Sequence, residues 1–161
     1  MIRVSTIAQT IAQLAGSECW YVNAGGPAGA SFSLAFGEKV PRSVALKNPA
    51  VSPEFRAFEG AYNLYVWCSW RLETEDAALA SSDQDVKDST PKLETLMGRR
   101  LVSIEADPRS LDLKLQFDDR VLRVFCDHVA PNASYDANWE LYSGGRCLRA
   151  GPGFDWTEEE A

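Results

Sequence analysis

A loose internal repeat restricts the possible folds of this chain more than any other feature. Residues 11–16 (IAQLAG) match residues 93–98 (LETLMG), and residues 32–36 (FSLAF) match residues 113–117 (LKLQF). Both matches have an offset of about 82 residues. In a chain of 161 residues, such a repeat predicts two similar halves, residues 1–82 and residues 83–161.

The two halves differ by an insertion. Trp70 matches Trp139 at an offset of about 69, so the first half has roughly a dozen extra residues, which we place in a loop over residues 47–59. Each half is too small to bury a large core alone, so we expect them to pack together as one compact unit. Alternatively, any β-rich chain shows such hydrophobic echoes, and the two Trp residues would then occupy unrelated positions in the fold.

Each half is predicted to begin with a short amphipathic helix. Apolar residues recur at helical spacing in both segments, and Gly16 and Gly98 follow them at the position where a helix end favours positive φ. We expect Ser5 or Thr6 to cap the first helix and Thr90 to cap the second.

Strands follow each helix. Residues 111–117 alternate apolar and polar side chains, which predicts a strand with one buried face. We expect hairpin turns at residues 118–119 and 37–38, with return strands over residues 120–127 and 39–46. Further strands are predicted over residues 64–73 and 138–143, each followed by a turn and a short final strand.

The predicted fold is therefore α+β and mainly antiparallel β. It consists of two similar repeats, each with a short helix and a meander of four to five strands, packed as a sandwich or a partly open barrel.

The net charge limits the kinds of partner that this chain can bind, and its hydropathy indicates the compartment. The chain has 16 Lys and Arg residues against 23 Asp and Glu residues, a formal net charge of −7. This balance argues against nucleic acid and anionic membranes as partners and favours a basic protein. No run of about 18 apolar residues predicts a membrane span, and the first 16 residues do not resemble a signal peptide, so we expect a cytoplasmic protein.

The cysteines and the single histidine do not have metal-ligand spacing. Cys19, Cys68, Cys126 and Cys147 are widely separated, and His128 is the one imidazole. We therefore predict no metal and no cofactor. The apolar neighbours of each Cys favour buried free thiols, whereas two disulfides remain an alternative for a secreted protein.

The sequence contains no catalytic signature. His128 follows Asp127, but adjacent strand residues point to opposite faces, so an exposed histidine at a strand end is favoured over a general base. The glycine-rich residues 25–29 have neither the Lys-Ser/Thr of a phosphate loop nor the spacing of a dinucleotide fingerprint, so they are interpreted as a loop between strands.

Aromatic residues are concentrated in residues 61–73. Alternation places Tyr65 and Trp67 on one face and Trp70 on the other, and Trp70 is the better core candidate because Trp139 repeats it. Tyr65 and Trp67 are then candidate anchors for a partner, since such residues dominate binding hot spots. Burial beneath the inserted loop is the open alternative.

Acidic residues are concentrated around the junction of the two halves. They are explained either by solvation or by steering of a basic partner, and they complete the predicted partner-binding set. The set consists of Tyr65, Trp67, Glu73, Glu75, Asp76, Asp83, Asp85 and Asp88. A second acidic run lies at Asp155, Glu158, Glu159 and Glu160.

Three segments carry a resemblance to a known group of proteins: residues 96–102 (LMGRRLV), residues 113–125 (LKLQFDDRVLRVF) and residues 138–141 (NWEL). They resemble a small β-rich domain family of bacteria, and similar acidic proteins occur among the immunity proteins of bacterial toxin systems. The resemblance covers mainly residues 93–149 and rests on hydrophobic spacing. It implies a bacterial cytoplasmic protein that binds another protein, such as a toxin domain, and it transfers no binding or catalytic residue.

Two hypotheses of function follow. The first is a non-enzymatic protein-binding module, of the immunity type, that neutralises a basic toxin or effector. The second is a small-ligand-binding protein or a carboxylate-based enzyme with a pocket between the repeats, because duplicated halves often leave a cleft at their junction.

Overall fold

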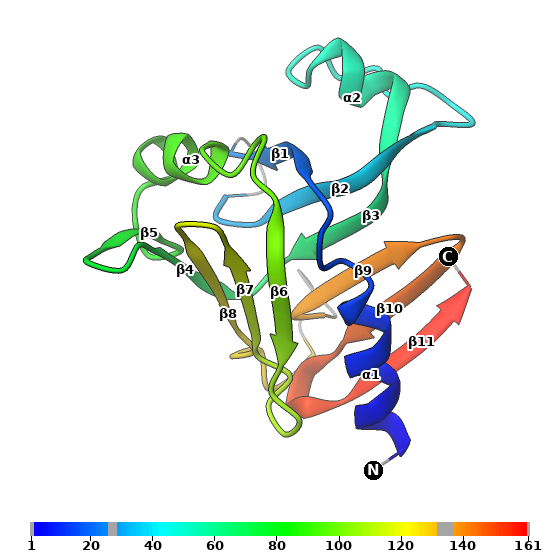
Figure 1. Cartoon of the computed structure of the whole chain (residues 1–161), viewed down its shortest axis with the longest axis vertical. Coiled ribbons are helices and arrows are strands. Elements are labelled where there is room, and N and C mark those ends of the chain that lie inside the picture. Colours follow the sequence, from blue (N-terminus) through cyan, green and yellow to red (C-terminus); the bar gives the residue numbers. More distant parts are fainter. Residues whose placement is uncertain (1, 26–28, 132–136, 161) are drawn as a thin grey trace.

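Two antiparallel sheets pack against each other without closing into a barrel (Figure 1). The computed structural model describes residues 2–25, 29–131 and 137–160. The larger sheet has the strand order β1-β2-β3-β9-β10-β11 and the smaller sheet the order β5-β4-β8-β7-β6. The elements in chain order are α1 (Ile2–Ala12), β1 (Cys19–Ala24), β2 (Phe32–Pro41), α2 (Pro53–Ala57), β3 (Phe58–Val66), β4 (Ser69–Glu73), β5 (Ala78–Ser81), α3 (Val86–Glu94), β6 (Leu101–Ala106), β7 (Leu113–Phe117), β8 (Val121–Phe125), β9 (Trp139–Ser143), β10 (Arg146–Ala150), η2 (Pro152–Phe154) and β11 (Trp156–Glu160). The prediction of an α+β fold dominated by antiparallel sheet is thus confirmed.

Each sheet contains strands from both halves of the chain. In the larger sheet, β3 of the first half pairs with β9 of the second, and in the smaller sheet, β8 of the second half pairs with β4 of the first. The halves therefore exchange their last strands, which differs from the simple meander expected for each half. The exchange occurs because the chain leaves the larger sheet after Val66 and enters the smaller sheet at Ser69.

Matched hydrogen bonds are found in the two halves. The indole Nε1 of Trp70 donates to the carbonyl of Ala30, and that of Trp139 donates to the carbonyl of Leu111, both at 2.9 Å. The two Trp residues thus occupy equivalent positions, and the outcome that would have contradicted the repeat is not observed.

The link between the two helix ends is symmetric as well. Gly16 N donates to the carbonyl of Leu101 and Gly98 N donates to the carbonyl of Cys19, each at 2.7 Å. Both glycines have positive φ, but each lies four residues beyond its helix, since α1 ends at Ala12 and α3 at Glu94, so the predicted position at the helix end is wrong.

One continuous core fills the space between the sheets. Trp70, Trp139, Phe36 and Phe117 are among its largest fully buried side chains. Helix α1 packs on β6, while α3 contacts β1 and β5, so α3 bridges an edge strand of each sheet. The alternation over residues 111–117 is confirmed, since Leu113, Leu115 and Phe117 are buried while Lys114 is exposed.

Both predicted helix starts are wrong. Helix α1 already begins at Ile2, so Ser5 and Thr6 lie within it, since no Gly or Pro interrupts the preceding residues. Helix α3 begins at Val86 because the Asp85 side chain accepts a hydrogen bond from Lys87 N at 3.1 Å and caps the helix one turn earlier than Thr90 would.

The predicted hairpin turn at residues 37–38 is also wrong. Strand β2 continues to Pro41, and Gly37, at a φ of +79°, lies at an irregularity in the pairing with β3. The glycine therefore lies at a bulge rather than in a hairpin turn. The return strand is β3, reached through an insertion that contains α2, so a long insertion in this region of the first half is confirmed while the strand over residues 39–46 is not.

Candidate functional site

A pocket of about 340 Å³ lies on the outer face of the larger sheet, over the seam between β3 and β9. At this seam the strands of the two halves meet, and Tyr65 pairs with Glu140. The flanking residues Leu64, Val66 and Leu141 are buried in the core, so these two side chains point away from it. The seam pocket is lined by Arg42, Glu59, Asn63, Tyr65, Trp67, Glu140 and Tyr142.

Three aromatic rings form a packed group in the seam pocket. The rings of Tyr65 and Trp67 stack with 6.2 Å between centroids and an interplanar angle of 11°. Tyr142 packs edge-on against Tyr65 at 5.4 Å. Trp67 is 37% exposed and Tyr65 is half-buried, so the rings present apolar area to solvent while supporting one another.

The buried carboxylate of Glu140 fixes this aromatic group. Glu140 is only 7% exposed. Its carboxylate oxygens accept hydrogen bonds from Trp67 Nε1 at 2.8 Å and from the Tyr142 hydroxyl at 3.1 Å. Arg149 adds Nε and Nη2 at 2.9 and 2.8 Å and neutralises the charge. A buried carboxylate with this many donors is stabilised and holds its neighbours in one geometry.

The ionisation of both tyrosines is suppressed. Burial raises the pKa of the Tyr142 hydroxyl above its usual value, and contacts with Cys147 and Glu140 add to the effect. Burial also raises the pKa of Tyr65. Both hydroxyls therefore stay protonated at neutral pH, so that Tyr142 remains a donor to Glu140.

The insertion that contains α2 supplies one wall of the seam pocket. Arg42 Nε donates to the carbonyl of Phe55 at 2.9 Å, and the guanidinium lies over the Phe55 ring at 4.6 Å. Arg42 also forms an ion pair with Glu59 at 3.7 Å. Phe55 in turn packs in a second small apolar cluster on β1 and β2. The insertion therefore borders Trp67 rather than burying it.

The equivalent seam of the smaller sheet, between β4 and β8, has different chemistry. Because Val66 pairs with Trp139 and Val124 pairs with Trp70, Arg123 occupies the position of Tyr65, and Arg71 that of Glu140. Glu73 accepts from Arg71 at 2.5 Å and from Arg123 at 3.0 Å. Partial burial works against ionisation of Glu73, but the two arginines outweigh it and lower the pKa of this carboxyl. Both arginines of this seam therefore pair with the same carboxylate.

The structure separates the predicted partner-binding set into two groups. Tyr65 and Trp67 lie in the seam pocket on the larger sheet, while the acidic residues belong to the smaller sheet and to the segments around α3. Glu73 is on β4, Glu75 and Asp76 are in the turn before β5, Asp83 precedes α3, Asp85 caps that helix, and Asp88 is in its first turn. The two groups do not form one surface.

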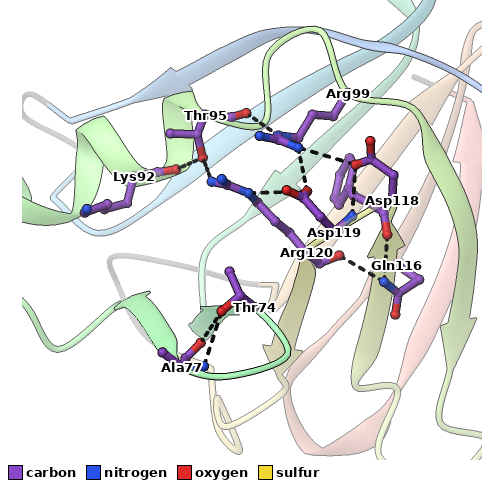
Figure 2. A network of polar contacts seen from close by, with 10 residues as sticks. Thr74, Ala77, Lys92, Thr95, Arg99, Gln116, Asp118, Asp119 and Arg120 are labelled. Atoms are coloured by element: carbon purple, nitrogen blue, oxygen red, sulfur yellow. Dashed lines mark hydrogen bonds and ion pairs between the residues drawn. The ribbon is translucent and has the colours of Figure 1, made fainter.

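The depression that Glu75 and Asp76 border, about 830 Å³ in volume, has arginines beside its carboxylates. Figure 2 shows the network around it, in which Arg99 pairs with Asp119 at 2.5 Å and donates to the carbonyl of Thr95 at 2.8 Å. Arg120 reaches both Asp119 and the Thr95 hydroxyl. These bonds connect the end of α3 to the turn between β7 and β8, so the role of these residues is structural.

The remaining candidates from the sequence are the four cysteines, His128 and the glycine-rich segment. All four cysteines are buried and free, as the favoured prediction held, and burial raises the pKa of Cys19 to about 12. His128 Nδ1 lies 3.1 Å from the carbonyl of Ala137. In the glycine-rich segment, residues 26–28 lie outside the described residues.

The described residues contain neither a cluster of metal-ligating side chains nor a membrane-spanning helix. Over residues 2–25, 29–131 and 137–160, no group of three or more His, Cys, Asp and Glu side chains is arranged to hold a metal ion. Within the same ranges, no helix is long and apolar enough to cross a membrane.

Sequence reasoning missed Glu140, Tyr142 and Arg42. Alternation outward from the buried Trp139 gives the orientation of the first two, but the sequence does not show that β9 lies beside β3.

Comparison of the chain with protein-family models, with curated proteins and with solved structures found no match.

Proposed function

We propose that this protein is a non-enzymatic protein-binding module that binds a basic protein partner through the seam pocket. The observation that carries the proposal is a group of aromatic side chains, partly exposed at Trp67 and held rigid from below by the buried Glu140. Rigid, partly exposed aromatic residues are typical binding anchors, because little side-chain entropy is lost when a partner covers them.

The contrast between the two seams supports this assignment. The two seams occupy equivalent positions in the two sheets, yet at the β4–β8 seam one carboxylate, Glu73, pairs with Arg71 and Arg123. The β3–β9 seam instead has aromatic rings beside a hollow. Packing of the core does not require this difference, since both outer faces point away from it.

Charge favours a basic partner. The net charge of the chain is −7, and Glu59 at the rim of the seam pocket has a side chain that is 47% exposed. On the same sheet, strand β11 adds Glu159, which is exposed and pairs with Arg149. A net negative charge speeds encounter with a basic protein, while the aromatic anchors supply affinity. We propose a basic toxin or effector domain, neutralised in the bacterial cytoplasm as by an immunity protein.

The test is capture with tagged protein at low and high salt, followed by calorimetry with the purified partner. Trp67→Ala is expected to weaken binding about 30-fold or more, as for an anchor worth about 2 kcal/mol, without loss of folding. Phe125→Ala, at the position equivalent to Trp67 on the other seam, is the matched control and should bind as the wild type does. Unchanged affinity for Trp67→Ala, or equal loss in both variants, would overturn the proposal.

A small-molecule site is the second candidate, and one observation favours it. The seam pocket lies where the two halves join, and its volume of about 340 Å³ is at the lower end of the range of roughly 300–1,000 Å³ for ligand pockets. A metabolite that binds there should raise the melting temperature of the wild type and have no effect on Trp67→Ala. No shift across a broad metabolite panel would contradict this candidate.

A further inference from the structure

Two buried thiols, Cys68 and Cys126, face each other where the chain crosses between the sheets. Ser69 and Phe125 are a terminal pair of the β4–β8 ladder, Cys68 immediately precedes Ser69, and Cys126 immediately follows Phe125. Continuing the antiparallel register by one position sets the two cysteines opposite each other. The neighbouring Cys126 thiol, together with burial, raises the pKa of Cys68.

The backbone around this pair suits a disulfide. Cys68 N donates to the carbonyl of Asn138 at 3.3 Å, and Cys126 N donates to the Asp112 carboxylate at 2.7 Å. Neither amide donates across the pair, as in a non-hydrogen-bonded pair, whose Cα atoms are about 4.5 Å apart. A disulfide accepts Cα separations of roughly 4.4–6.8 Å.

The other two cysteines have different neighbours. The Cys19 thiol donates to the carbonyl of Tyr21 at 3.6 Å, and the Cys147 thiol lies 3.9 Å from the Glu140 carboxylate. They therefore serve as controls that share burial with the Cys68–Cys126 pair and lack its facing thiol.

We propose that Cys68 and Cys126 are a modification site that a low-molecular-weight disulfide, such as oxidised glutathione, converts into an intramolecular disulfide. The two thiols together lose two protons and two electrons, and one S–S bond forms between them. The S–S bond of the oxidant breaks, and its two sulfur atoms take up the two electrons and the two protons, which releases two thiols. The new bond joins the crossover that carries Trp67 to the end of β8.

The test is refolding of the full chain from urea in a glutathione redox buffer. Refolding is needed because burial and the raised pKa of Cys68 slow exchange in the folded protein. The expected product has lost two hydrogens by mass, yields a cross-linked peptide that contains Cys68 and Cys126, and melts roughly 5–15 °C above the reduced protein. The Cys19→Ser and Cys147→Ser variants should form the same link, and Cys68→Ser should not.

Two results would overturn the proposal. Both are measured in the wild-type chain, so they do not depend on whether the variants fold. In the first, Cys68 and Cys126 remain free thiols after refolding under oxidising conditions. In the second, each carries a separate glutathione adduct, or one of them pairs with Cys19 or Cys147 instead.

Discussion

Removal of the Glu140 carboxylate tests whether the seam pocket is held from below. In Glu140→Ala, Trp67 Nε1 and the Tyr142 hydroxyl lose their acceptor, and the Arg149 guanidinium loses two charge-assisted hydrogen bonds. Breaking one side of a fully buried ion pair costs about 3–5 kcal/mol. Arg149 keeps Glu159 at 3.2 Å and its side chain is 26% exposed, so the expected loss in the free energy of unfolding is about 2–4 kcal/mol.

The assay is urea unfolding followed by tryptophan fluorescence and circular dichroism. For a chain of this size the loss corresponds to a fall of roughly 4–16 °C in melting temperature. Glu140→Gln keeps an acceptor without the charge and should lose about 1–2 kcal/mol. The control is Glu158→Ala, which removes a single exposed ion pair with Arg146 and should cost less than about 1 kcal/mol. If Glu140→Ala costs no more than this control, the carboxylate does not hold the aromatic group.

Three further predictions concern the frame around the site. Asp85→Ala should lower the free energy of unfolding by about 1 kcal/mol, measured in urea, because it removes the cap of α3. Gly60→Ala should cost at least about 3 kcal/mol, because a Cβ would lie 2.7 Å from the Tyr62 carbonyl, whereas Gly98→Ala meets no atom within 4 Å and costs about 1–2 kcal/mol for its positive φ. Glu73 should stabilise the fold relative to Glu73→Gln, with the full difference in the free energy of unfolding present above its unfolded pKa of about 4.3. The difference should vanish as the pH falls through the lowered pKa of the folded state. A difference that does not depend on pH would contradict the pairing of Glu73 with Arg71 and Arg123.

The strands that short-range patterns specify were predictable from sequence. The strict alternation over residues 111–117 produced β7, and the glycine pair Gly144 and Gly145, both at positive φ, produced the turn between β9 and β10. The equivalence of Trp70 and Trp139 also followed from the repeat.

The exchange of strands between the halves was not predictable, and the reason lies in the crossover. Leu64, Val66, Cys68 and Trp70 are all buried, so the alternation continues without a break from β3 into β4. A burial pattern of period two cannot show that the chain leaves one sheet and joins another. For the same reason the sequence indicated Tyr65 and Trp67 but not the opposite side of the pocket, which comes from the other half.

The exchanged strands also determine the order in which this protein can fold on the ribosome. Tyr65 on β3 pairs with Glu140, about 75 residues later, so β3 has an unpaired edge until the last quarter of the chain has been synthesised. Pairing over such a separation is slow, and an open apolar edge attracts other strands. The first half is therefore most prone to aggregation while the rest of the chain is still being synthesised. A chaperone would protect the chain most at that point.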